Sequence, residues 1–515
     1  MFNLGVDLPR PIRSVGIPRR VSAMFRILFP IRSLIALCIL ISWQGSIHAA
    51  PPNVVLIMVD DLNDWVGCLG GHPQSLTPNI DRLAAKGVLF ANAHCQAPLC
   101  NPSRSSLLTG LRPSTTGIHG LVPGIRSVEA TKAAKTLPQA FTGSGYYTYT
   151  CGKVFHDGSV AREKSEFVVW GPAPGPTRPE KPIANLPEPR HPAMDWGIFP
   201  DRDEDHCDFR IANAAIEAIH HAPKDKPFFV ASGFRSPHVP CFAPQKWFDA
   251  FPEETITLPE ILDNDRSDVP PFAWKLHWRL PEPRLATLQK VREWKTLVRA
   301  YLASIHFMDA QVGRVLQALD ASGRVNNTIV VLLSDHGYHL GEKCITGKNS
   351  LWERSTRVPL IFSGPGIARG VCQESVELLD FYPTLLQWCA LPPVSGLEGH
   401  SLVPQLKDPK AIRPWPAITT HNQGNHAIRT KTHRYIHYAD GTEELYDMIL
   451  DPREWKNLAN DPQKAHLKAE MAGWLPKPDA PAAKDSQHRI LTFDKATGIS
   501  TWEGVRIGSK DLPPP

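Results

Sequence analysis

Short, unbroken apolar runs that end abruptly in polar residues constrain the fold of this chain most strongly. Residues 54–59, 228–231 and 329–333 form such runs. A continuous apolar run of this length is typical of a strand buried on both faces, as in a parallel sheet that helices cover on both sides. Apolar residues at helical spacing follow at 208–221 and 285–319. The sequence therefore predicts an α/β fold with a large, mostly parallel sheet.

Polar side chains stand directly beyond these predicted strands. Asp60 and Asp61 follow the first run, His238 lies beyond the second, and Asp335 and His336 follow the third. Open α/β sheets bind ligands outside the carboxyl ends of their strands. We therefore expect these residues to share one site.

A fourth predicted strand repeats the arrangement. Residues 145–152 are aromatic and β-branched, and Lys153 and His156 come just after them, while Lys348 follows the third run by a short loop. An isolated loop lysine or histidine usually faces solvent, but the repeated position at strand ends favours a shared catalytic site.

The adjacent acids Asp60 and Asp61 suggest a cation. Two neighbouring carboxylates repel each other unless a positive charge lies between them. The alternative is that the pair caps a helix, although the residues from Leu62 onward are not strongly helical.

The segment 100–110, CNPSRSSLLTG, combines a modifiable side chain with the start of a helix. Pro102 fits the first helical position and Gly110 ends the helix, so Cys100 would stand beside a positively polarised N-terminus that favours anions. Without its neighbours, Cys100 would be interpreted as an ordinary buried cysteine.

The pattern C-x-P-S-R-x-x-x-L-T-G in this segment resembles the signature of type I sulfatases, in which the cysteine is oxidised to formylglycine. The resemblance extends through TPNIDRLA, GKVFH, SPHVP, SDHG and the GK before LWE, and it is strongest to the iduronate 2-sulfatase branch. It implies that Cys100 becomes an aldehyde whose hydrate is the nucleophile. Arg104 would hold one of its hydroxyl groups.

The same resemblance implies the architecture. We expect an alkaline-phosphatase-like sandwich of helices around the sheet over residues 50–395, followed by a smaller C-terminal α+β subdomain with an antiparallel sheet over 396–480. The segment 481–515 is a tail of unassigned structure. The residues themselves also support a separate antiparallel subdomain, because strand-like stretches and a turn at Asp440-Gly441 follow Pro392.

The resemblance also implies one divalent cation. Asp60, Asp61, Asp335 and an oxygen of modified Cys100 would bind it, and Ca²⁺ accepts such oxygen ligands with loose geometry, while Mg²⁺ stays an alternative. Many sulfatases carry an amide where this chain has His336. His336 is therefore expected either to bind the metal or to contact sulfate.

In the mechanism that the resemblance implies, a diol hydroxyl attacks sulfur while Lys153, Lys348 and His238 contact the sulfate. His238 or Lys348 protonates the leaving oxygen, and His156 takes the proton of the second hydroxyl so that sulfate is eliminated. The expected substrate is a sulfated sugar or polysaccharide, with a 2-O-sulfated uronic acid as the leading choice. The alternatives are a phosphate or phosphonate monoester hydrolase of the same superfamily and a noncatalytic binder of sulfated glycans. The intact CNPSR sequence argues against the binder.

The beginning of the chain predicts export. An arginine-rich start, an apolar run at 34–43 and small residues before Pro51 are typical of a secretory signal over residues 1–49, with Met24 as a possible true start. The alternative, a membrane anchor, needs about 20 apolar residues, more than this run contains. We therefore expect a periplasmic or extracellular protein without a stable membrane span.

Composition excludes some further classes. The formal charge of +5 over 515 residues gives no indication of nucleic-acid binding. The 10 cysteines are scattered without a C-x-x-C pair, which argues against zinc ribbons and leaves room for one or two disulfides. The expected partners are the sulfated carbohydrate and a formylglycine-generating maturation enzyme.

Overall fold

The computed structural model describes residues 51–156 and 166–508. The predicted signal segment lies outside the described residues. Among the helices of the described part, none combines the length and apolar character that a membrane crossing requires.

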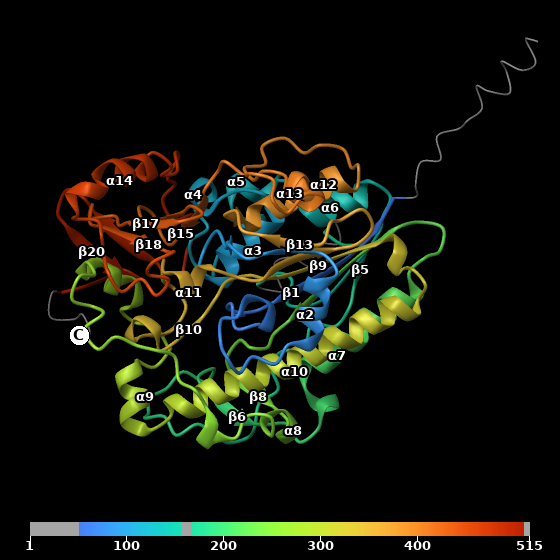
Figure 1. Ribbon diagram of the computed structural model, residues 1–515, viewed down its shortest axis with the longest axis horizontal. Helices are drawn as coiled ribbons and strands as arrows, with labels where there is room; N and C mark the ends of the chain where they lie inside the picture. Colours follow the sequence, from blue (N-terminus) through green and yellow to red (C-terminus); the bar gives the residue numbers. More distant parts are fainter. Residues whose placement is uncertain (1–50, 157–165, 509–515) are drawn as a thin grey trace, which may run out of the picture. The chain divides into compact units, whose positions relative to one another are not determined.

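An eight-stranded sheet forms the centre of the protein (Figure 1). Its strand order is β13-β2-β12-β9-β1-β7-β4-β5. Strand β1 runs parallel to both neighbours, with Val54 opposite Phe229 and Ile329, whereas β12 is antiparallel to β9 and β2. The mostly parallel sheet predicted from the sequence is confirmed. The strands are β1 (Asn53–Val59), β2 (Val88–Phe90), β4 (Tyr147–Gly152), β5 (Val169–Trp170), β7 (Phe228–Phe234), β9 (Thr328–Ser334), β12 (Leu360–Ser363) and β13 (Gly370–Cys372).

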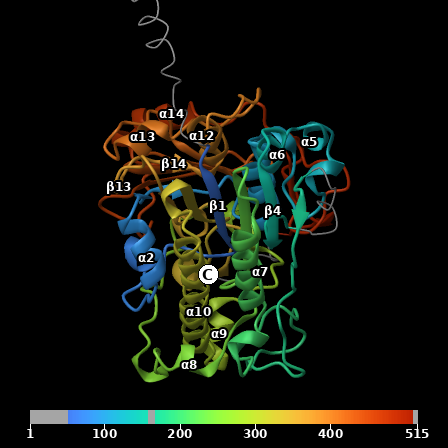
Figure 2. The ribbon, with the colours of Figure 1, turned by 90° about the vertical axis from the view of Figure 1, so that its right-hand side faces the viewer.

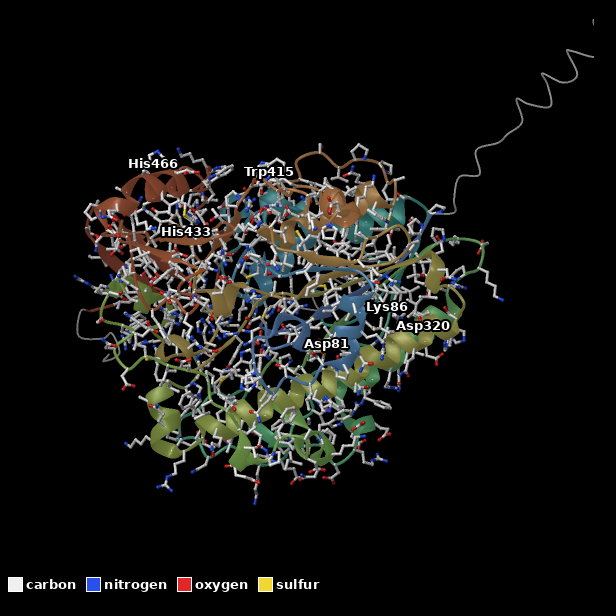
Figure 3. The ribbon with its side chains drawn as sticks, in the orientation of Figure 1. Asp81, Lys86, Asp320, Trp415, His433 and His466 are labelled. Atoms are coloured by element: carbon white, nitrogen blue, oxygen red, sulfur yellow. The ribbon has the colours of Figure 1, made fainter. Side chains whose placement is uncertain are left out.

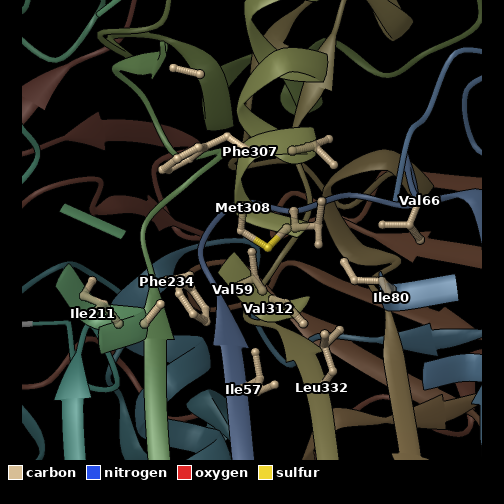
Figure 4. Close-up of a cluster of buried hydrophobic side chains, with 14 of the residues drawn as sticks. Ile57, Val59, Val66, Ile80, Ile211, Phe234, Phe307, Met308, Val312 and Leu332 are labelled. Carbon is tan, nitrogen blue, oxygen red and sulfur yellow. The ribbon is translucent and has the colours of Figure 1, made fainter. Parts of the chain in front are cut away.

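Helices cover both faces of the sheet, which explains why β1 is apolar from Val54 to Val59. Alternate residues of β1 point to opposite faces, so Ile57 and Val59 belong to one buried cluster and Leu56 and Met58 to another. Figure 4 shows Ile57 and Val59 below Met308 on the first face. The first cluster includes α2 (Pro78–Ala85), α7 (Cys207–His221) and α10 (Trp294–Ala321), and the second includes α3 (Cys100–Thr109), α6 (Leu137–Gly143) and α12 (Phe381–Trp388).

The helical periodicity predicted over 285–319 is divided between two helices. α9 (Leu285–Val291) ends at Arg292, whose left-handed φ of 63° turns the chain before α10 begins. Figure 2 shows α10 beside α7.

A carboxylate of α10 supports the beginning of α2. Asp309 accepts hydrogen bonds from the backbone N–H groups of Asn79 (3.1 Å) and Ile80 (2.8 Å). These N–H groups belong to the first turn of α2, which has no acceptors within its own helix. Figure 3 labels Asp81 on α2 and Asp320 at the end of α10.

A second, antiparallel sheet follows toward the C-terminus, as predicted. β15 (Ala417–Thr420), β16 (His426–Arg429), β17 (His433–His437) and β18 (Glu443–Asp447) pair in sequence order, and α14 (Ala465–Ala472) follows them. Residues 50–515 group into one compact unit, and the boundary at residue 395 stays a prediction.

The tail that had no assigned structure forms a small antiparallel sheet. Its strands are β19 (Leu491–Asp494), β20 (Ile499–Trp502) and β21 (Val505–Arg506). The other, shorter elements are β3 (Ala93–His94), α4 (Pro113–Thr116), α5 (Glu129–Lys132), β6 (Trp196–Ile198), β8 (Cys241–Ala243), α8 (Gln245–Phe248), β10 (His339–Leu340), β11 (Thr346–Gly347), α11 (Glu353–Thr356), β14 (Val376–Glu377) and α13 (Val403–Lys407).

Candidate active site

The strand order explains how distant residues meet. β4, β7, β1 and β9 are consecutive neighbours in the sheet and run parallel, so the residues after them share its carboxyl edge. The structure brings all of the predicted site residues to this region. They are Asp60, Asp61, Cys100, Arg104, Lys153, His156, His238, Asp335, His336 and Lys348.

Helix α3 places Cys100 at this edge, with one correction to the predicted helix start. The helix begins at Cys100, so Pro102 is its third residue rather than its first. A proline is tolerated there because the N–H groups of the first helical turn have no acceptor within the helix. Gly110 ends the helix in a left-handed conformation with φ of 73°, as predicted.

Arg104 links the ends of several strands. Its Nη2 lies 2.9 Å from Asp60 Oδ1 and its Nε lies 2.8 Å from Asp335 Oδ2. Nη1 donates to the backbone carbonyls of Lys153 and Val154. The side chain is only 1% exposed, and a buried guanidinium needs such partners to offset its lost hydration.

Two lysines neutralise the aspartate pair. Lys153 Nζ pairs with Asp60, and Lys348 Nζ donates to both oxygens of Asp61 at 2.7 and 3.0 Å. Burial raises the pKa of Asp60, but the charges of Lys153, His238 and Arg104 together outweigh burial, and the pKa falls below its usual range. Burial would lower the pKa of Lys348, but Asp61, Cys100 and Asp60 together raise it.

Cys100 lies among positive groups. Its Sγ is 3.2 Å from His336 Nε2 and 3.2 Å from Lys348 Nζ. Burial raises the pKa of the thiol, but Lys153, Lys348 and His336 together lower it well below its usual value. Position 100 is therefore an environment that stabilises a negatively charged atom.

The histidines differ in their electrostatic surroundings. Burial alone would lower the pKa of His336, but Asp335, Cys100 and Asp61 together raise it to about 9. Burial lowers the pKa of His156, which hydrogen-bonds the thiol of Cys100. The Nδ1 of His156 has no partner among the described residues, so this imidazole is suited to accept a proton.

A cavity of about 320 Å³ opens onto Cys100. Cys100, Lys153, His156, His238 and Lys348 line it. A larger cavity of about 850 Å³ contains none of the predicted site residues and shares no lining residue with it.

Sequence reasoning missed several residues of the smaller cavity. Arg235 follows β7 directly and could have been recognised by the strand-end rule that identified His238. The others lie in segments without periodicity, which gave no signal. The missed polar residues are Arg178, His191, Arg235, Glu282 and Arg489.

The donor set fits a hard divalent cation. Ligand atoms of Asp60, Asp61, Cys100 and His336 all lie within 4.8 Å of one another, and all four residues are buried. Carboxylate oxygens suit Ca²⁺ or Mg²⁺. Asp335 is not part of this group, and its oxygens accept from Arg104 and from the backbone N–H groups of Asp61 and His336.

The chain matches known families over nearly all of its described length. Residues 52–391 match the sulfatase family, and residues 341–479 match the N-sulphoglucosamine sulphohydrolase C-terminal family.

Two curated relatives and one solved structure agree with this assignment. A sulfatase of Formosa agariphila is 41% identical over 461 residues, which covers 86% of this chain and 90% of the relative. Iduronate 2-sulfatase of Mus musculus is 32% identical, over 82% of this chain and 94% of the relative. A solved 2-O GAG sulfatase superposes with a TM-score of 0.65 at 26% identity, over 82% of this chain and 90% of that one. The chain belongs to the sulfatase family, the enzymes that hydrolyse sulfuric esters.

Proposed function

We propose that this sulfatase removes sulfate from a sulfated sugar or polysaccharide, with a 2-O-sulfated uronic acid as the leading substrate. The observation that carries the proposal is the setting of Cys100, buried at the start of α3 and surrounded by Lys153, Lys348 and His336. The similarity to an iduronate 2-sulfatase and to a 2-O GAG sulfatase supports the choice of sugar.

In this proposal Cys100 is converted to formylglycine, whose hydrate supplies a hydroxyl nucleophile. Arg104 offsets the negative charge around that hydroxyl, while Lys153 and Lys348 neutralise charge on the sulfate oxygens. His238 is suited to protonate the leaving oxygen, because its Nε2 is 3.9 Å from Asp61 Oδ2 and its side chain is 27% exposed to the cavity.

His156 completes the cycle by taking a proton at position 100. Its lowered pKa keeps it neutral before the reaction, and its contact with Cys100 places it within reach. Lys348 is a less suitable proton donor than His238, because its raised pKa favours retention of its proton.

A divalent cation, Ca²⁺ in preference to Mg²⁺, would be held by Asp60, Asp61 and His336, with Asp335 beside them. It would supply a Lewis acid that offsets the charge of the transferring group. The cations Arg104, Lys153 and Lys348 already contact the same carboxylates. Metal binding therefore has to rearrange some of these ion pairs.

Export is also part of the proposal. The signal-like segment over residues 1–49 would direct the protein to the periplasm or the exterior. Oxidation of Cys100 would require a formylglycine-generating enzyme in the source cell.

The deciding experiment measures sulfate release from sulfated uronic acid and hexosamine disaccharides, using protein coexpressed with a formylglycine-generating enzyme. Release confined to 2-O-sulfated uronates supports the leading substrate, and release from another sugar changes the substrate only. Phosphate release from phosphate esters that exceeds sulfate release would favour the phosphohydrolase alternative. Binding without release, with formylglycine confirmed by mass spectrometry, would favour the noncatalytic binder.

A further inference from the structure

The C-terminal tail contributes an arginine to the catalytic cavity. Arg489 precedes β19 and lines the same cavity as Cys100 and Lys348. The two family matches end at residues 391 and 479, before this arginine. Neither family match therefore includes Arg489.

Arg489 is fixed beside the residues that contact the nucleophile. Its Nη1 donates to Asn349 Oδ1 at 3.0 Å and lies 3.2 Å from Glu282 Oε2. Asn349 directly follows Lys348, whose Nζ is 3.2 Å from Cys100 Sγ. The Arg489 side chain is only 13% exposed, so it is held inward rather than extended into solvent.

Part of the guanidinium remains available to a ligand. Both of its hydrogen bonds start from Nη1, and Nε and Nη2 have no partner among residues 51–156 and 166–508. Guanidinium donors form a planar fork that matches the oxygens of a carboxylate or a sulfate.

The backbone around Arg489 is strained. His488 and Arg489 have φ of 64° and 77°, in the left-handed region that side chains other than glycine rarely adopt. The conformation is held from both sides, because Leu121 N donates to His488 O (3.2 Å) and Asn422 Nδ2 donates to Arg489 O (3.1 Å). Strain that the surroundings enforce in this way is concentrated at active sites and ligand clamps.

The lining of the cavity has an excess of positive charge. Lys153 and Lys348 are paired with the aspartates. The lining contains three further cations, all arginines, and one acidic residue, Glu282, which pairs with Arg489. A partly enclosed pocket with this balance attracts anions. The three arginines are Arg178, Arg235 and Arg489.

We propose that Arg489, together with Arg178 and Arg235, binds a second anionic group of the substrate, separate from the sulfate ester that reacts at Cys100. The inference rests on the proposed function and narrows its substrate class. It predicts sulfated sugars that carry a further carboxylate or sulfate, rather than esters with a single charge.

Three matched sugars test the proposal. They are the methyl glycoside of a hexuronic acid 2-sulfate, the same sugar with its carboxyl group reduced to a neutral hydroxymethyl, and the reduced sugar sulfated at that hydroxyl. We expect kcat/KM of the modified wild type to be about 10- to 100-fold higher for at least one dianionic sugar than for the monoanionic one, as one charged hydrogen-bonded contact allows. Whether the carboxylate or the second sulfate is preferred identifies the group that is bound.

Variants assign the preference to Arg489. Arg489→Gln should remove most of the preference, and Arg489→Lys should retain part of it, because lysine keeps the charge without the fork. Arg506→Gln, on the exposed β21 of the same tail, is the matched control and should keep the wild-type preference. Equal kcat/KM of the wild type on all three sugars, or an equal loss on all three in Arg489→Gln, would overturn the proposal.

A binding measurement separates this proposal from the proposed function. If none of the three sugars releases sulfate, the proposed substrate is wrong. Calorimetry on the Cys100→Ala protein can still compare the affinities of the three sugars. Tighter binding of a dianionic sugar that is lost in Cys100→Ala/Arg489→Gln supports the second anion site. No preference in binding contradicts it.

Discussion

Replacing Arg104 by methionine should destabilise the folded protein strongly. Arg104 contacts Asp60 and Asp335, and the side chains of both acids are at most 1% exposed. Methionine is similar in length but cannot donate hydrogen bonds, so the variant leaves two buried carboxylates without their shared cation. The loss should appear in the free energy of unfolding of the whole protein.

The size of the destabilisation depends on which partners Asp60 and Asp335 keep in the variant. Breaking one buried ion pair costs about 3–5 kcal/mol, and two independent pairs would cost about twice that amount. The two pairs are not independent here, because Asp60 keeps Lys153 and Asp335 keeps the backbone N–H groups of Asp61 and His336. We therefore expect Arg104→Met to lower the unfolding free energy by about 3–5 kcal/mol, and Arg104→Lys by about half as much.

Urea unfolding followed by circular dichroism, with the slope fitted for each protein, measures this difference. The experiment is performed in EDTA and repeated with excess Ca²⁺, which should stabilise the variant if the ion occupies the space near these acids. Arg202→Met is the control, since Arg202 pairs with Asp205 on the surface and its loss should leave the midpoint unchanged. An Arg104→Met protein within about 1 kcal/mol of the wild type, at an unchanged slope, would refute the reasoning.

Three further predictions concern the nucleophile, pH and a helix start. Cys100→Ala should lower sulfate release by at least about 10⁴-fold without changing the urea midpoint by more than the measurement error, and a fully active variant would end the covalent interpretation. Burial lowers the pKa of His339 to about 3 from 6.5, so the unfolded state binds the proton more readily and stability is lost as pH falls below 6.5. Between pH 7 and pH 5, protonation of this histidine in the unfolded state should lower the unfolding free energy by about 2 kcal/mol. His339→Gln should lose this part of the pH dependence, and an unchanged pH dependence in the variant would contradict the assignment. Asp309→Ala should lower the unfolding free energy by about 1–2 kcal/mol by uncapping α2, whereas the exposed Asp320→Ala should not, and equal effects would contradict the capping role.

The sequence predicted the sheet and the site where local residue order determines position. β1 could be recognised because both of its faces are buried, which favours the unbroken apolar run from Val54 to Val59. Once β1 and β9 were assigned as parallel strands, the edge at which Asp60 and Asp335 lie followed from the direction of the chain.

Other features depend on contacts that no local pattern reports. The antiparallel direction of β12 is set by its place between β9 and β2. Arg489 reaches the cavity because residues far away in the sequence, Leu121 and Asn422, hold the backbone around it. The break at Arg292 is an isolated left-handed residue inside an otherwise helical pattern. These positions could not have been derived from periodicity or composition.

The burial of Cys100 also has a consequence for the order of events during biosynthesis. The residue is 1% exposed and lies at the wall of a cavity of about 320 Å³, which is far too small to admit the active site of another protein. If Cys100 is oxidised as proposed above, a modifying enzyme could reach it only before the segment around α3 has folded. Modification would then have to precede tertiary folding, and the speed at which the newly made chain collapses would limit the fraction of modified molecules.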